Sequence, residues 1–192
     1  MGEIEKILPT MLEAVRGLEV EIVIPAAHER AEKAIRRILD RAGVTTVRLQ
    51  RGGARELLQR ATCAVVASGT ATLEAALARC PTVLVYRCDW FMATFLRFAI
   101  KAIRHVGLAN IIWEKCDPAA ADKSKMGPMP ELLQENFTAP AVRRYLDAWL
   151  NDPAERAKAI AGLDAAMAHL QSEGDPLTHV VEELVPQAVG VG

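Results

Sequence analysis

The stretch Cys-Ala-Val-Val-Ala-Ser-Gly-Thr-Ala-Thr-Leu-Glu, residues 63–74, contains the junction that decides the fold of this chain. Its first five residues form a short apolar run, which is typical of a strand buried on both faces of a parallel sheet. Small polar residues follow at 68–72, and the alanine-rich segment 75–78 then favours a helix. Residues 63–78 therefore predict a strand, a tight polar turn and a helix, which is the repeating unit of an α/β protein.

The polar turn has the features of an anion-binding site. A helix that starts there presents unpaired backbone N–H groups and the positive end of its dipole. Gly69 has no Cβ, so a ligand can approach the backbone closely. Ser68, Thr70 and Thr72 add hydroxyl groups, and Glu74, about one turn into the helix, can accept hydrogen bonds from sugar hydroxyls. Two interpretations stay open: a phosphate or diphosphate site, and the N-cap of an ordinary α/β helix.

Apolar periodicity along the chain predicts alternating strands and helices. Strands are expected at 20–24, 44–49, 63–67 and 82–86, and helices at 3–16, 28–42, 54–60, 70–79 and 90–104. Pro9 is expected to kink or open the first helix, and Pro25 to end the first strand. Residues 113–130 are expected to form a loop, followed by helices at 131–135, 139–151, 153–171 and 176–185. The alternation predicts right-handed units in a doubly wound parallel sheet.

The chain opens with a helix, whereas a doubly wound domain normally opens with a strand and a loop. Either the fold begins unusually, or the sequence is the downstream part of a longer protein; we expect a Rossmann-like sheet that lacks its first strand. We expect residues 1–135 to form this doubly wound domain. Residues 136–192 are expected to add a helical C-terminal tail that packs on the same domain.

Composition and charge exclude several classes of protein. The chain has 192 residues, of which 51% are hydrophobic and 24% charged, and this balance suits one globular domain. A net charge of −1 and an aromatic content of 5% argue against a nucleic-acid partner. The four cysteines and four histidines lack the spacing of a metal site. We therefore expect reduced, packed thiols and no metal.

No targeting or membrane-spanning segment is expected. Residues 1–5 contain two acids and no apolar leader, and the apolar stretch 90–103 is interrupted by Arg97 and Lys101. These features predict a cytoplasmic protein. Residues 90–104 also combine bulky apolar and basic side chains, which suits either a core helix or a lipid-contacting one.

An ordered series of motifs resembles one enzyme family. The motifs are Glu3-Ile4 with Ile7-Leu8-Pro9, residues 68–74, Cys80-Pro81, Tyr86-Arg87, Ala109-Asn110 and residues 130–134. Together they are similar to the C-terminal, donor-binding half of the lipid-A-disaccharide synthases, over roughly residues 3–185. The resemblance implies a GT-B glycosyltransferase domain that needs no cofactor. It also implies transfer of 2,3-diacylglucosamine from UDP to 2,3-diacylglucosamine 1-phosphate.

The resemblance also implies a set of donor-binding residues. Ser68, Gly69, Thr70 and Ala71 would meet the UDP diphosphate, and Glu74 the ribose. The remaining positions expected to line the donor site are Thr72, Tyr86, Arg87, Asn110 and Gln134. Simpler roles stay open for three of them: a strand-end arginine, a turn asparagine and a helix-surface glutamine.

The partners implied by the resemblance are UDP-diacylglucosamine and, through an acceptor-binding domain that this chain lacks, a lipid X-type acceptor. No catalytic residue is expected within the chain, which alone would be inactive. Contact with the inner membrane is expected near Trp90-Phe91, and homodimerisation is a further expectation. Two alternatives stay open. One is another GT-B enzyme, such as a UDP-GlcNAc epimerase or the murein glycosyltransferase, and the other is a non-catalytic, dimerising or nucleotide-sugar-binding subunit.

Overall fold

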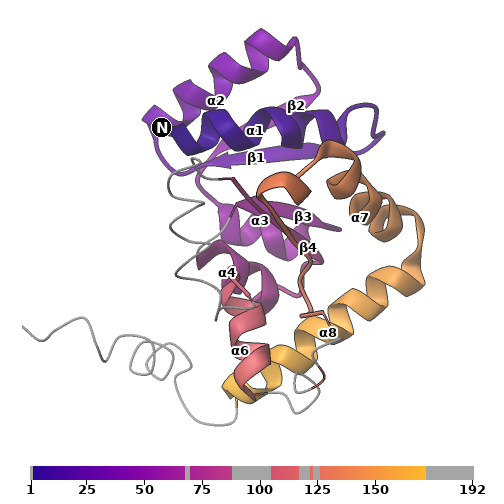
Figure 1. Cartoon of the computed structure of the whole chain (residues 1–192). Helices are drawn as coiled ribbons and strands as arrows, with labels where there is room; N and C mark the ends of the chain where they lie inside the picture. Colours follow the sequence, from indigo (N-terminus) through magenta and orange to yellow (C-terminus); the bar gives the residue numbers. More distant parts are fainter. Residues whose placement is uncertain (1, 68–69, 88–104, 117–121, 123–125, 172–192) are drawn as a thin grey trace, which may run out of the picture.

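The computed structural model describes residues 2–67, 70–87, 105–116, 122 and 126–171 (Figure 1). Four expectations lie outside these residues: the helix at 90–104, the helix at 176–185, the membrane contact at Trp90-Phe91 and the positions of Ser68 and Gly69.

Strands and helices alternate through the first half of the chain, as predicted. The elements are α1 (Gly2–Val15), β1 (Ile22–Ala26), α2 (Glu29–Ala42), β2 (Val47–Arg51), α3 (Ala54–Arg60), β3 (Ala64–Ala67), α4 (Thr70–Leu77) and β4 (Thr82–Tyr86). Helix α1 continues through Pro9 without interruption. Gly43 ends α2 in the left-handed conformation, with φ of 62°, which a residue without a Cβ adopts at low cost.

Strand β1 runs through Pro25, so the expectation that this proline ends the strand is wrong. The carbonyl of Ala26 accepts a hydrogen bond from Gly52, just beyond β2. Because successive residues of a strand point their polar groups to opposite edges, Ile22, Ile24 and Ala26 face β2. Pro25 faces the other edge, where its missing N–H breaks no bond to β2.

The second half contains α6 (Leu108–Cys116), β5 (Glu131–Leu133), the 3₁₀ turn η2 (Gln134–Asn136), α7 (Ala139–Asn151) and α8 (Pro153–Gln171). Two expectations are wrong here. Residues 113–116 belong to a helix rather than a loop, because Trp113 packs into the core. Residues 131–133 form a strand rather than a helix, because they pair with β4. Tertiary pairing outweighs local preference in so short a segment.

The described strands form two parallel sheets, in the orders β1-β2 and β3-β4-β5. Val65 pairs with Val83, and Tyr86 with Leu133. Helices cover both faces of the three-stranded sheet, which confirms the predicted Rossmann-like α/β class. Among the described residues, no strand of one sheet pairs with a strand of the other.

Alternate side chains of β3 and β4 enter two different cores. Leu84 and Val66 pack toward α4, α6 and α8, whereas Val83, Val85 and Val65 pack toward α1 and α7. A third core lies between α1, α2 and the β1-β2 sheet. In Figure 1, α2 lies at the upper end of the molecule, and α6 and α8 at the lower end.

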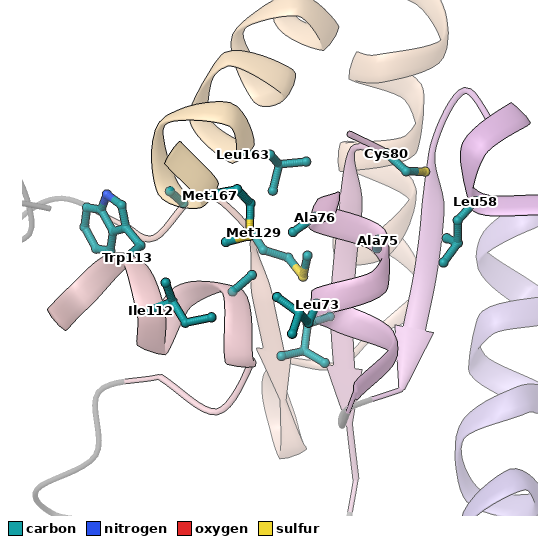
Figure 2. Close-up of a cluster of buried hydrophobic side chains, with 13 residues drawn as sticks. Leu58, Leu73, Ala75, Ala76, Cys80, Ile112, Trp113, Met129, Leu163 and Met167 are labelled. Carbon is teal, nitrogen blue, oxygen red and sulfur yellow. The ribbon is translucent and has the colours of Figure 1, made fainter. Parts of the chain in front are cut away.

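The core between α4, α6 and α8 fixes the helix that follows the polar turn. Figure 2 shows Leu73 and Ala76 of α4 near Met129, with Leu163 from α8 and Ile112 from α6 around them. Ala75 and Ala76 are 0% and 1% exposed. These small side chains allow the neighbouring elements to approach α4 closely, so that the helix packs tightly into this core.

Candidate donor-binding site

The carboxyl ends of β3, β4 and β5 lie together at one edge of the sheet. Ala67 pairs with Val85, and Tyr86 with Leu133, so the chain leaves the three strands at neighbouring points. Thr70 at the start of α4, Arg87 after β4 and Gln134 after β5 lie at this edge, which we call the carboxyl edge. Ligands of open α/β sheets bind outside this edge, where the strand order reverses.

The first turn of α4 divides its side chains between solvent and core. Thr70 and Glu74 are exposed, Ala71 is half-buried and Thr72 is 0% exposed. The Thr72 hydroxyl accepts a hydrogen bond from the N–H of Leu108 at 3.2 Å, so it contacts the start of α6. Thr70 and Glu74 remain accessible to a ligand, whereas Thr72 helps to hold α4 against α6.

Arg87 connects the end of β4 to two other elements. Its Nη2 donates to the carbonyl of Phe137 at 2.6 Å, and its Nη1 donates to the Thr10 hydroxyl of α1 at 3.4 Å. The guanidinium also lies 4.9 Å from the centre of the Phe137 ring. These contacts orient the half-buried arginine at the carboxyl edge and join α1 to the segment before α7.

Gln134 follows β5 in a conformation that side chains rarely adopt. Its φ of 52° lies in the left-handed region, where a residue with a Cβ is strained by about 1–2 kcal/mol. Such strain is concentrated at binding sites and active sites. Gln134 is half-buried, beside the position where β4 ends.

Asn110 lies in the first turn of α6, and its side chain points into the interior. The residue is 1% exposed, and its Nδ2 donates to the Met129 carbonyl at 2.7 Å and to Glu131 Oε1 at 2.8 Å. Its Oδ1 accepts from the Met129 N–H at 3.0 Å. A Cβ at Gly127 would lie 2.5 Å from Asn110 Cγ, so the amide is enclosed on that side as well. The side chain therefore holds the segment before β5 against α6.

Glu131 is a site residue that the sequence reasoning missed, although the motif at 130–134 contains it. Its carboxylate accepts hydrogen bonds from the N–H groups of Val106, at 3.0 Å, and Gly107, at 3.1 Å. Both groups lie just before α6, so the carboxylate satisfies unpaired amides at a helix start. Together with Thr72 and Asn110, it forms a buried polar network between α4, α6 and β5.

His105 is a second buried polar residue that the sequence analysis did not single out. It is 6% exposed, with Nδ1 3.7 Å from Glu131 Oε1 and its ring 5.9 Å from that of Trp113. Among the residues that the structure describes, Nε2 of His105 has no hydrogen-bond partner. An isolated histidine in an apolar segment gives no signal by which the sequence could have revealed this position.

Cys63 and Cys80 are free thiols. Burial raises the pKa of each thiol from its ordinary value of 9.0 to about 11, so both are protonated at neutral pH.

Within the described ranges, no three His, Cys, Asp or Glu side chains are grouped as metal ligands. Within those same ranges, no helix is long and apolar enough to cross a bilayer.

Comparisons with known proteins give the same family as the motifs. Residues 1–152 match the family described as lipid-A-disaccharide synthetase. The chain is 33% identical over 189 residues to the lipid-A-disaccharide synthase of Anaeromyxobacter dehalogenans, covering 96% of this chain and 46% of that protein. It is 33% identical over 170 residues to the enzyme of that name from Thiobacillus denitrificans, covering 86% and 42% of the two chains. With the Myxococcus xanthus enzyme it shares 35% identity over 143 residues, covering 72% and 34%.

The chain thus spans about half the length of the curated relatives that it matches. The family match covers most of its residues, including every element from α1 to α7. The chain therefore belongs to the lipid-A-disaccharide synthetase family.

Proposed function

We propose that this chain binds the UDP-linked sugar donor of a lipid A glycosyltransferase at its carboxyl edge. The observation that carries the proposal is the position of the start of α4. In a chain of this family, α4 begins at Thr70, three residues after the end of β3 and beside the ends of β4 and β5, and its Thr70 and Glu74 are exposed. An anion placed there faces the N-terminus of α4.

The proposed roles follow from exposure and hydrogen bonding. The backbone amides of residues 68–71 hold the diphosphate, with the hydroxyls of Ser68 and Thr70, and Glu74 accepts hydrogen bonds from the ribose. Arg87 and Gln134 line the adjoining strand ends with Tyr86. Thr72 and Asn110 act as positioning residues, since both side chains are buried and hydrogen-bonded within the protein.

The proposed reaction transfers 2,3-diacylglucosamine from UDP to the hydroxyl of 2,3-diacylglucosamine 1-phosphate. The bond between the anomeric carbon and UDP breaks, a glycosidic bond to the acceptor oxygen forms, and UDP leaves. The amides at the start of α4 stabilise the negative charge that develops on the leaving diphosphate, without a metal. Acceptor binding and proton removal fall to the part of the longer relatives that this chain does not span. Contact of Trp90-Phe91 with a membrane surface is proposed from their side-chain chemistry.

Calorimetric titration of UDP into the 192-residue chain tests the donor site. We expect saturable binding, and about ten- to hundredfold weaker binding by Glu74→Ala, since hydrogen bonds to a charged group contribute about 1.5–3 kcal/mol. Glu13→Ala is the matched control. Glu13 is an exposed helical glutamate toward the end of α1 that leads into β1, away from the carboxyl edge. Its removal should leave UDP binding unchanged.

Two results would reject the donor site. One is the absence of UDP binding at millimolar concentration by a folded chain. The other is equal affinity of the parent and Glu74→Ala. Self-association of the chain without UDP binding would favour the non-catalytic, dimerising alternative.

A further inference from the structure

Glu131 is a buried carboxylate that the sheet holds in place. As the first residue of β5 it pairs with Leu84 of β4, and the carbonyl of Pro130 just before it accepts the N–H of Leu84 at 2.8 Å. The side chain of Glu131 is 8% exposed. Because successive side chains of a strand point to opposite faces, it leaves the sheet on the face opposite to Leu132, which packs toward α7. The carboxylate is therefore directed toward α6.

The donors that surround this carboxylate all come from the start of α6. It accepts hydrogen bonds from the N–H groups of Val106, at 3.0 Å, and Gly107, at 3.1 Å. The side-chain amide of Asn110 adds a third donor at 2.8 Å. A buried carboxylate requires such donors, because a buried charge without them is costly. Since one fixed group of β5 serves three donors of one segment, it determines where α6 begins.

The next amide of the same segment joins α6 to α4. The N–H of Leu108 donates to the Thr72 hydroxyl at 3.2 Å. Thr72 is 0% exposed, and in the sequence it lies between Thr70 and Glu74, the two exposed residues of α4 that the proposed donor site uses. Three consecutive N–H groups, at positions 106, 107 and 108, therefore connect β5 to the first turn of α4.

The packing around Gly107 leaves little room for α6 to move independently of its neighbours. A Cβ at this position would lie 2.9 Å from Leu84 Cδ2, 3.3 Å from Glu131 Oε1 and 3.8 Å from Thr72 Cγ2. The start of α6 is thus enclosed by β4, β5 and α4 together. Close-packed protein interiors transmit a local displacement to the neighbouring elements. A shift at the start of α6 is therefore expected to move the first turn of α4.

We propose that Glu131 is a positioning residue for the donor: its carboxylate fixes the start of α6, and α6 fixes the first turn of α4 through Thr72. Glu131 itself does not contact the donor. The inference rests on the proposed function, because it assigns a remote support to the same site. The negative charge matters, because an amide in the same place would turn an N–H group toward the N–H of Val106 or Gly107.

Amide hydrogen exchange, followed by NMR without nucleotide, tests the connection between Glu131 and α4. The variant is Glu131→Gln in the 192-residue chain, which keeps the size of the side chain and removes its charge. Glu74 and Ala75 report on the first turn of α4, because their N–H groups bond one turn back in a regular helix. Val83, 0% exposed in β4, reports on global unfolding. Relative to Val83, we expect exchange at Glu74 and Ala75 to become about tenfold faster, since a hydrogen bond to a charged group is lost.

Asp164→Asn is the matched control, because it also removes a carboxylate that holds α4. Asp164 accepts two hydrogen bonds of 2.7 Å from Arg79, just beyond the opposite end of α4. This variant should leave exchange at Glu74 and Ala75 unchanged relative to Val83. If Glu131→Gln exchanges like the parent, or faster by one common factor at all three amides, the inference is overturned.

A second pair of variants covers the case in which Glu131→Gln does not fold. Thr72→Val interrupts the same connection at its other end and should accelerate exchange at Glu74 and Ala75 relative to Val83. Thr72→Ser keeps the hydroxyl and should restore the exchange of the parent. Parent-like exchange in Thr72→Val would also overturn the inference.

Calorimetric titration of UDP tests the consequence for the donor. We expect about five- to tenfold weaker binding by Glu131→Gln and by Thr72→Val. The double variant should bind no more weakly than Thr72→Val alone, because both residues act through one connection. Equal affinity of the parent and Glu131→Gln, or additive losses in the double variant, would overturn the inference. If the parent itself does not bind UDP, the donor site is rejected, whereas the exchange measurement still decides whether Glu131 holds α4.

Discussion

Replacement of Asn110 by alanine tests whether the buried network between α6 and β5 is structural. The variant loses three hydrogen bonds, two to the backbone of Met129 and one to Glu131. Met129 is 2% exposed, so its N–H and carbonyl would stay buried without a partner. The variant also leaves a small cavity beside Gly127. The native stability of the chain should therefore fall sharply.

The loss of stability follows from the two backbone groups of Met129 that lose their partners. Each buried, unpaired group costs about 1–3 kcal/mol, so the pair costs roughly 2–6 kcal/mol. A central value of about 4 kcal/mol lowers the melting temperature by roughly 8–16 °C for a chain of this size, at about 2–4 °C per kcal/mol. Loss of the hydrogen bond to the Glu131 carboxylate acts in the same direction.

The assay is urea unfolding of the parent and of Asn110→Ala, followed by circular dichroism. Asn151→Ala is the matched control, because Asn151 is exposed at the end of α7, and it should change stability by no more than about 0.5 kcal/mol. A loss of less than about 1 kcal/mol in Asn110→Ala would refute the reasoning. A variant of normal stability that no longer bound UDP would place the Asn110 amide in the donor site.

Three further predictions concern packing, the carboxyl edge and pH. Gly127→Ala should lower the free energy of unfolding by about 1–3 kcal/mol, because the new Cβ would lie 2.5 Å from Asn110 Cγ, and an unchanged urea midpoint would contradict this. Arg87→Lys should cost about 1–2 kcal/mol in the same assay, because an ammonium group cannot reproduce both the carbonyl contact and the stacking on a ring; equal stability would show that neither contact matters. Burial raises the pKa of the Cys63 and Cys80 thiols from 9.0 to about 11, so the folded state keeps protons that the unfolded chain has lost, and stability should fall as the pH rises from 9.0 to about 11. In the double alanine variant this fall should be smaller; an identical pH dependence would exclude the thiols as its source.

Elements defined by local chemistry were predicted well. The strand β3 and the helix α4 follow from an apolar run and an alanine-rich segment in succession. The end of α2 follows from Gly43, which is suited to a left-handed C-cap. Helices α7 and α8 were predicted with their bounds, because each has a clear start signal, Thr138 before α7 and Asp152 before α8.

Elements defined by distant partners were not predicted. Three residues cannot establish a period, and residues 131–133 are a strand only because β4 lies beside them. The helix through Trp113 requires two caps from elsewhere in the chain, the Thr72 hydroxyl and the Glu131 carboxylate. Neither cap lies near α6 in the sequence, so no local signal could indicate where this helix begins.

The sequence by itself determined the class of fold, the family and the group of residues expected around the donor. Apolar runs, glycine positions and small polar segments are local properties, so they can be recognised in the sequence without coordinates. Only the tertiary structure decided which of these polar groups reach solvent. Thr70 and Glu74 are exposed, whereas Thr72 and Asn110 are buried and hydrogen-bonded. The physical reason is that burial depends on which elements pack against a residue, and those elements come from distant parts of the chain.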